Sequence, residues 1–134
     1  MQIDLNSLVS ILFCLSNPHS RSQLSDVAEG LNYLHTYNVI HGDLKGVCGR
    51  LKPRTITVLI LGQPNVLIDA FGDARIVDFG FATVTQNLDS VRSLSCQGGQ
   101  TLRWSAPEVL NGERHSEEAD IFAFAMVMVE VRHD

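Results

Sequence analysis

Four polar side chains in this sequence have the types needed for phosphate chemistry: Asp43, Lys45, Asn65 and Asp78. Transfer of a phosphoryl group asks for little covalent chemistry from a protein, but it requires accurate placement of a hydroxyl group, a phosphate and magnesium. Carboxylate and amide oxygens suit this placement because Mg²⁺ prefers oxygen ligands. Taken singly, Asp43 and Asp78 are also ordinary residues for a solvated loop or strand end. The surrounding sequence pattern therefore has to distinguish a functional role from simple solvation.

The motifs around these residues follow one order along the chain. They are His41-Gly42-Asp43-Leu44-Lys45, Asp78-Phe79-Gly80, Ala106-Pro107-Glu108, and Asp120 at the start of an apolar run. Tyr33-Leu34-His35 precedes the first motif, and Trp104 precedes the third. In this order the motifs resemble the larger lobe of a eukaryotic protein kinase. The resemblance covers nearly the whole chain apart from one insertion.

The resemblance implies a role for each side chain. Asp43 would accept the proton of the substrate hydroxyl, and Lys45 would meet the transferring phosphate of ATP. Asn65 and Asp78 would hold Mg²⁺, and together with Lys45 they would form the binding set for ATP and Mg²⁺. Thr101 would hydrogen-bond to Asp43 and Lys45; the alternative is an ordinary loop threonine.

Two details of the motifs refine the family resemblance. Lys45, two positions after Asp43, is the pattern of serine/threonine and tyrosine-kinase-like enzymes, and Thr101-Leu102-Arg103-Trp104 looks like the tyrosine-kinase-like branch. Gly42 stands where most family members have an arginine that pairs with a phosphate on the activation loop. We therefore expect little dependence on phosphorylation of that loop.

The spacing between Asp43 and Asn65 departs from the family pattern. The family's asparagine follows the aspartate by five positions, whereas here the separation is 22 positions, which leaves 17 extra residues at 47–63. We expect this apolar, Pro53-containing insertion to disrupt a loop that must place its groups within a fraction of an ångström. Val47-Cys48 can be encoded by the intron donor GTATGT and Gln63 by the acceptor end CAG, so we interpret 47–63 as a retained intron. The alternative is a genuine insertion with a β-strand at 55–61.

Hydrophobic periodicity predicts the elements that would position the site. Apolar residues recur at helical spacing from Ser20 to Asn38, which predicts an amphipathic helix. Strands are predicted at 66–68 and 74–77, joined as a hairpin by turn-forming residues. A long loop is predicted at 81–105, and Ser116 is expected to cap a helix through the apolar run 121–131. The expected fold class is α+β: a mainly helical, partial kinase C-terminal lobe with a small β-hairpin and without the N-terminal lobe.

Composition restricts the partners and the location. The formal net charge is −5 and the ten Lys and Arg residues are scattered, which argues against nucleic acid or a membrane surface as partner. The apolar run 8–15 is too short to span a bilayer and is interpreted as a core helix. Cys14, Cys48 and Cys96 predict neither a disulfide framework nor a zinc site. We expect an intracellular protein, cytoplasmic or nuclear, with a protein substrate or protein partner; its oligomeric state is not predicted.

Residues 1–134 are expected to form one partial kinase domain, from about helix D to helix F of the family. They contain no glycine-rich phosphate loop and no strand lysine with a helix glutamate partner, which in the family cover and align the ATP phosphates. Our first hypothesis is a serine/threonine-type kinase that transfers phosphate from ATP to protein, with these residues inactive alone. A non-catalytic kinase-like scaffold and an incomplete gene model are the alternatives.

Overall fold

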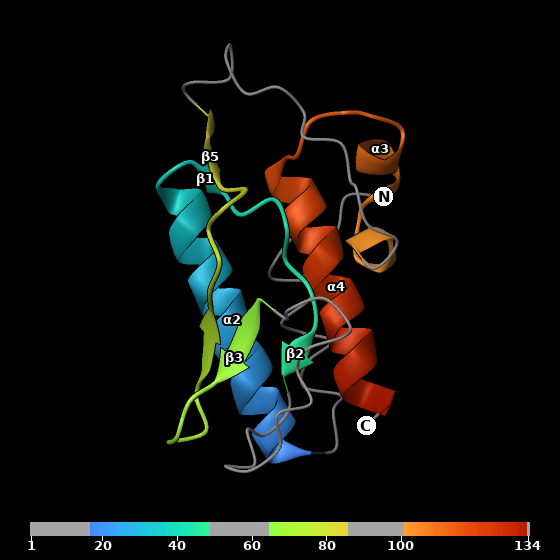
Figure 1. The fold of residues 1–134 in the computed structure, drawn as a ribbon. Helices are drawn as coiled ribbons and strands as arrows, with labels where there is room; N and C mark the ends of the chain where they lie inside the picture. The colour runs from blue at the N-terminus through green and yellow to red at the C-terminus, as the bar shows by residue number, and fades with distance from the viewer. Residues whose placement is uncertain (1–16, 49–64, 86–100, 134) are drawn as a thin grey trace.

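The computed structural model describes residues 17–48, 65–85 and 101–133 (Figure 1). Its first described helix, α2 (Pro18–Thr36), begins where the Asn17 side chain accepts a hydrogen bond from the His19 N–H at 3.0 Å. The helix ends before Asn38, whose φ of 57° does not occur in a right-handed helix. The helix predicted at 20–38 is confirmed, with both ends shifted two residues toward the N-terminus by these local conformations.

The second long helix, α4 (Glu117–His133), contains the apolar run. The Ser116 hydroxyl accepts a hydrogen bond from the Ala119 N–H at 3.1 Å, which confirms the predicted cap. Three carboxylates in the first turn favour the positive end of the helix dipole. Phe124 is fully buried, whereas Val129 is 50% exposed, so the apolar run is covered on one side and open on another.

Two small sheets connect the helices. β1 (Val39–Ile40) pairs antiparallel with β5 (Thr83–Val84). The second sheet has the order β2-β3-β4 and consists of β2 (Val47–Cys48), β3 (Val66–Ile68) and β4 (Ala74–Ile76). β3 and β4 form the predicted antiparallel hairpin, whereas β2 lies parallel to β3. The α+β class is confirmed; the sequence does not predict β1, β2 and β5, because strands of two residues are too short to show a period.

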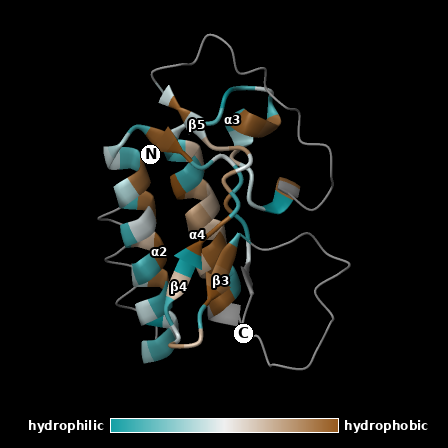
Figure 2. Ribbon diagram, turned by 60° about the vertical axis from the view of Figure 1, so that its left-hand side comes forward, coloured by the Kyte–Doolittle hydropathy of each residue, from teal (hydrophilic) through white to brown (hydrophobic). Residues whose placement is uncertain are grey.

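The two long helices share one core. Figure 1 shows α2 and α4 side by side in opposite directions, with the hairpin packed over α2. In Figure 2 the hydrophobic residues of α2 line its inner edge, and its outward face is hydrophilic. The core residues are Leu24, Val27, Ala28, Leu31, Leu44, Val66, Ala74, Ala123, Phe124, Val127 and Met128. Because Leu44 belongs to this core, it anchors the loop that carries Asp43 and Lys45.

The long loop predicted at 81–105 is wrong at both ends. Besides β5, a 3-10 turn, η2 (Thr101–Arg103), leads toward the short helix α3 (Pro107–Leu110). The predicted core helix at 8–15, the alternative strand at 55–61 and residues 86–100 lie outside the described residues. Of the helices in the described ranges, none has the length and apolarity to cross a membrane.

Candidate active site

A buried carboxylate on α4 fixes the loop that follows β1. Asp120 is 2% exposed, and its two oxygens accept hydrogen bonds from the His41 N–H at 2.7 Å and the Gly42 N–H at 2.9 Å. His35, near the end of α2, adds a third contact, from Nε2 to Asp120 Oδ2 at 3.0 Å. An ionised carboxylate only accepts hydrogen bonds, so His35 Nε2 is the donor. The loop is thereby tied to both long helices.

The His41 ring links this loop to the hairpin. The ring is fully buried, and its Nε2 lies 3.1 Å from the Val77 carbonyl oxygen, which assigns the hydrogen to Nε2. Nδ1 is then the acceptor for the Asp43 N–H at 3.4 Å. The rings of His41 and Phe79 meet edge to face with centroids 5.4 Å apart. His41 therefore orients Asp43 on one side and the residue before Asp78 on the other.

Three of the predicted site residues are in direct contact. The Lys45 ammonium donates a hydrogen bond to Asp43 Oδ2 at 2.7 Å. The Asn65 Nδ2 donates to the backbone oxygen of Asp43 at 2.6 Å and to its Oδ2 at 3.1 Å. Asp43 is 8% exposed and Asn65 is fully buried, which strengthens these charge-assisted bonds relative to bonds in water. Both side-chain contacts fall on one oxygen of the Asp43 carboxylate.

The 17 extra residues do not separate Asn65 from Asp43, so the expectation that they disrupt the loop is wrong in this structure. β2 and β3 run parallel and in register, with Val47 opposite Val66. The strands therefore start next to each other, and the Asn65 N–H donates to the Lys45 carbonyl at 2.9 Å. A parallel pair requires a connection of about a dozen residues or more, and the sequence between Cys48 and Val66 is long enough for one. The chain leaves the site after Lys45 and returns to it at Asn65.

Asp78 lies two residues beyond β4, at the edge of this cluster. Val77, immediately before it, donates its N–H to the Asn65 carbonyl at 2.9 Å. Asp78 has a φ of 63°, a conformation that is uncommon for residues other than glycine and that clusters at functional sites. Its carboxylate is exposed and accepts the Gly80 N–H at 3.3 Å. Asp78 is thus joined to Asn65 through the backbone.

The polar atoms at this edge fit a magnesium ion. Asn65 Oδ1 is buried and has no hydrogen-bond partner among the described residues, which is unfavourable unless water or a ligand occupies it. Mg²⁺ is usually bound through one or two protein oxygens together with phosphates and water, a set that Asn65 and Asp78 suit. No cluster of three or more His, Cys, Asp or Glu side chains placed for a metal occurs within 17–48, 65–85 and 101–133.

The segment after η2 returns to the loop of Asp43. A cavity of about 20 Å³, enough for one water molecule, lies between Asp43, Ser105 and Asp120. The position of Thr101 is described only for its backbone, at the start of η2, so its predicted contacts with Asp43 and Lys45 stay a prediction.

Glu130 on α4 fixes this returning segment. Its carboxylate accepts hydrogen bonds from Arg103 Nη1 at 3.2 Å and from Trp104 Nε1 at 3.1 Å. The sequence gives no signal for this role, because both partners lie more than 25 positions away and only the fold brings them together. His35 is likewise missed: at helical spacing it reads as part of the apolar stripe of α2, whereas it contacts Asp120.

The backbone conformation and the close neighbours of position 42 favour glycine there. Its φ is 79°, and a Cβ atom here would lie 3.0 Å from the Phe81 carbonyl oxygen and 3.6 Å from His115 Cγ. Glycine adopts this conformation without strain, whereas a side chain would meet both the strained φ and the close carbonyl. An arginine at this position would require the loop or Phe81 to move.

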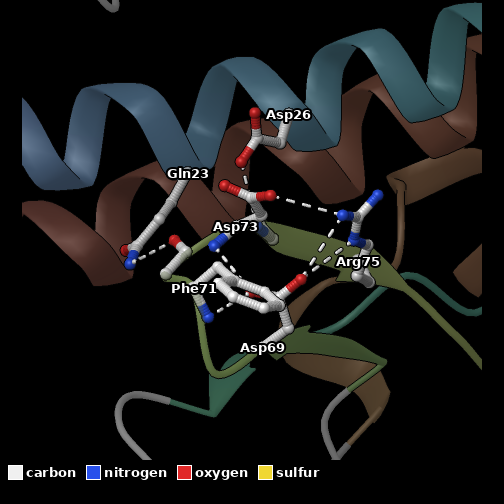
Figure 3. Close-up of polar contacts among 8 residues, drawn as sticks. Gln23, Asp26, Asp69, Phe71, Asp73 and Arg75 are labelled. Carbon is white, nitrogen blue, oxygen red and sulfur yellow. Dashed lines mark hydrogen bonds and ion pairs between the residues drawn. The ribbon is translucent and has the colours of Figure 1, made fainter.

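The turn between Asn65 and Asp78 is fixed by one aspartate (Figure 3). Asp69 Oδ1 accepts the N–H groups of Phe71 at 2.9 Å and Asp73 at 3.1 Å, and its Oδ2 lies 3.3 Å from two nitrogens of Arg75. Burial acts to raise the pKa of the Asp69 carboxyl. The backbone hydrogen bonds from Asp73 and Phe71, with the Arg75 guanidinium, outweigh it and hold that pKa below its ordinary value of 3.8.

Two side chains of α2 attach this turn to the helix. Gln23 donates to the Gly72 carbonyl at 3.3 Å, and the Asp26 carboxylate accepts the Ala74 N–H at 2.9 Å (Figure 3). The hairpin that carries Asn65 at one end and Asp78 at the other is therefore held at its turn as well as through its pairing.

Comparison with known proteins identifies matching sequences over most of the chain. The family described as protein kinase domain matches residues 61–133, a range that includes Asn65, Asp78 and Asp120 and begins near the end of the insertion. The "Probable serine/threonine-protein kinase drkC" of Dictyostelium discoideum is 35% identical over 134 residues, which cover 95% of this chain and 15% of that protein.

Two further relatives come from an animal and a plant. The mitogen-activated protein kinase kinase kinase dlk-1 of Caenorhabditis elegans is 31% identical over 108 residues, covering 81% of this chain and 10% of that protein. Serine/threonine-protein kinase STY17 of Arabidopsis thaliana is 35% identical over 106 residues, covering 79% and 15%. The chain therefore spans no more than 15% of the length of these three relatives.

Proposed function

This chain belongs to the protein kinase family, and on that premise we propose that it supplies the loop and magnesium-binding part of a site that transfers phosphate from ATP to serine or threonine of a protein. The observation that supports the proposal is the contact of Asp43 with Lys45 and Asn65 across the 17-residue insertion. Sequence similarity alone supports only the types of the residues. The contact supports their placement as well, and phosphoryl transfer depends on placement.

Each residue has a role that follows from its surroundings. The Asp43 carboxylate accepts the proton of the attacking hydroxyl, and the Lys45 ammonium offsets negative charge on the transferring phosphate. Asn65 Oδ1 and the Asp78 carboxylate would hold Mg²⁺, which when bound neutralises charge on the phosphate oxygens. Asp120 and His41 do not touch substrate; they position Asp43 through the loop backbone. Thr101 would complete the set by bonding to Asp43 and Lys45.

We place the site in the serine/threonine, tyrosine-kinase-like branch, acting on a protein substrate in the cytoplasm or nucleus. The 134 residues would not transfer phosphate by themselves, because their sequence contains no glycine-rich loop or strand lysine to cover and align the ATP phosphates. In this proposal they are one partial domain, equivalent to helix D to helix F, whose activity requires those further elements.

The test is a chimera in which residues 38–110 replace the matching segment of a relative's kinase domain. Transfer of labelled phosphate from ATP to a serine-containing protein should occur, and Asp43→Asn should lower its rate by about 100-fold or more, as expected for loss of a general base. Asp73→Asn, the same change on an exposed carboxylate of the hairpin, is the control and should leave the rate unchanged. A folded chimera that is inactive until 47–63 is deleted would contradict the proposal.

The same chimera tests the consequence of Gly42. Because an arginine is absent there, we propose that activity is insensitive to phosphorylation of Thr83, Ser93 or Ser95. Glutamate substitutions at Thr83, Ser93 and Ser95 should change the rate little. A strong increase would refute this part of the proposal and point to another cation that reads the phosphate.

A further inference from the structure

The small cavity beside Asp43 lies where three segments meet: the loop of Asp43, the segment after η2, and helix α4. Each segment contributes to its lining, with Gly42 from the loop, Ser105 from the returning segment and Asp120 from the helix. Its volume of about 20 Å³ exceeds the roughly 10–15 Å³ that one water molecule requires. Pockets for organic ligands are larger by an order of magnitude. The size therefore restricts the occupant to a molecule as small as water.

The Asp120 carboxylate gives this cavity a buried acceptor. Its Oδ2 accepts hydrogen bonds from the His41 N–H at 2.7 Å and from His35 Nε2 at 3.0 Å, whereas the bond to Oδ1 comes from the Gly42 N–H at 2.9 Å. Gly42 also lines the cavity, so we assign Oδ1 to its wall. Each carboxylate oxygen has two lone pairs. Within the described ranges, Oδ1 thus retains one acceptor position for a donor inside the cavity.

The rest of the wall is largely apolar. Leu44, Ala119 and Ala123 line it, and these side chains form no hydrogen bonds. Cavities that stay dry are lined by apolar groups alone, whereas a cavity with buried polar groups holds water that bonds to them. Leaving a carboxylate beside an empty space would forfeit a hydrogen bond that cannot be replaced by solvent. The buried charge of Asp120 therefore favours an occupied cavity.

We propose that one ordered water molecule fills this cavity, donates a hydrogen bond to Asp120 Oδ1 and bonds to the Ser105 hydroxyl. A hydroxyl both donates and accepts, so Ser105 can take either role toward the water. The water joins the segment after η2 to the carboxylate that already fixes the loop of Asp43. This inference goes beyond the proposed function, because it requires neither ATP nor Mg²⁺ and holds even if the chain transfers no phosphate.

NMR measurement of water contacts in the labelled full chain tests the occupant directly. A long-lived water beside Asp120 should give a nuclear Overhauser effect from the water resonance to the Gly42 amide proton, which is buried from bulk solvent. Ser105→Ala removes a hydroxyl proton that exchanges with water; it is the control and should leave this effect in place. Absence of the effect, or its loss in Ser105→Ala, would overturn the proposal.

A pair of substitutions tests the hydrogen bond to Asp120. Ala123→Ser and Ala123→Cys each add one atom to the cavity wall and displace the water, but only the serine hydroxyl is a strong donor. Ala123→Ser should therefore unfold at the higher urea concentration. Ala28, a buried alanine in the apolar core, is the matched control; there the cysteine variant should be the more stable, because cysteine behaves as a small apolar residue.

The order of the two variants at each position decides the outcome. Serine above cysteine at position 123 together with cysteine above serine at position 28 supports a water that donates to Asp120. Cysteine above serine at both positions would show a dry cavity and would overturn the proposal. Circular dichroism without urea shows whether each variant is folded, and the measurement on the Gly42 amide proton needs no substitution.

Discussion

Two aspartates each organise a loop by accepting hydrogen bonds from two backbone N–H groups, one in the core and one at the surface. Asp120 accepts the N–H groups of His41 and Gly42, and Asp69 accepts those of Phe71 and Asp73. The Asp120 side chain is 2% exposed, whereas that of Asp69 is 28% exposed. Water can replace a lost partner at the surface but not in the core, so equal bond counts imply unequal contributions to stability.

The third hydrogen-bond partner of each aspartate also differs in exposure, in the same direction as the aspartates themselves. Asp120 is joined by His35, whose side chain is 9% exposed, and Asp69 by Arg75, whose side chain is 64% exposed. An exposed ion pair contributes little, because solvent screens it and two long side chains lose freedom. The buried aspartate holds the loop of Asp43, while the exposed one shapes the turn between Asn65 and Asp78. The comparison therefore predicts a steep ranking of variants.

The largest effect is expected for Asp120→Ala. The change leaves the His41 and Gly42 N–H groups and the His35 ring without their buried acceptor, which should lower the free energy of unfolding by about 3–5 kcal/mol. Asp120→Asn keeps one acceptor oxygen and should cost about half as much. Urea unfolding followed by circular dichroism measures both. An Asp120→Ala protein as stable as the Asp69→Ala protein would break the comparison.

An intermediate effect is expected for Gly42→Ala, with Gly72→Ala as its matched control. Both glycines have positive φ, 79° and 97°, so alanine should cost about 1–2 kcal/mol at each from backbone strain alone. At Gly42 the added Cβ also meets the Phe81 carbonyl at 3.0 Å, whereas at Gly72 nothing lies within 4 Å. Gly42→Ala should therefore be the more destabilising variant in the same urea assay. Equal losses of unfolding free energy in the two variants would show that the loop of Asp43 accommodates a Cβ atom as easily as the surface turn does.

The smallest effect is expected for Asp69→Asn, and it should depend on pH. Because folding lowers the pKa of Asp69 below 3.8, the carboxylate stabilises the fold fully above that pH and loses its contribution as pH falls through the lowered pKa. Wild type and Asp69→Asn, whose amide stays neutral, should differ slightly in melting temperature at pH 7 and converge as the pH falls below 3.8. A melting-temperature difference that stays constant between pH 7 and pH 3 would show that the charge of Asp69 does not stabilise the turn.

The sequence predicts the long elements better than the short strands that connect them. The 3.6-residue period of α2, the cap at Ser116 and the turn residues at 69–73 are local signals, and all three elements form as predicted. β2 is too short to have a signal, yet its parallel pairing with β3 returns Asn65 to Asp43. The predicted disruption of the loop by the insertion is therefore wrong in this structure. The number of residues between Asp43 and Asn65 does not set the distance between them, because the pairing of β2 with β3 brings both ends of the connection together.

The most direct test is the position of Asn65 in solution. Isotope-edited NMR of the labelled chain should show nuclear Overhauser effects from the Asn65 side-chain amide to Asp43 and Lys45, because Nδ2 lies 2.6 Å from the Asp43 carbonyl oxygen. The same amide protons should exchange slowly with water, since Asn65 is fully buried. Fast exchange without contacts to Asp43 or Lys45 would show that residues 47–63 displace Asn65 and that this chain does not assemble the site.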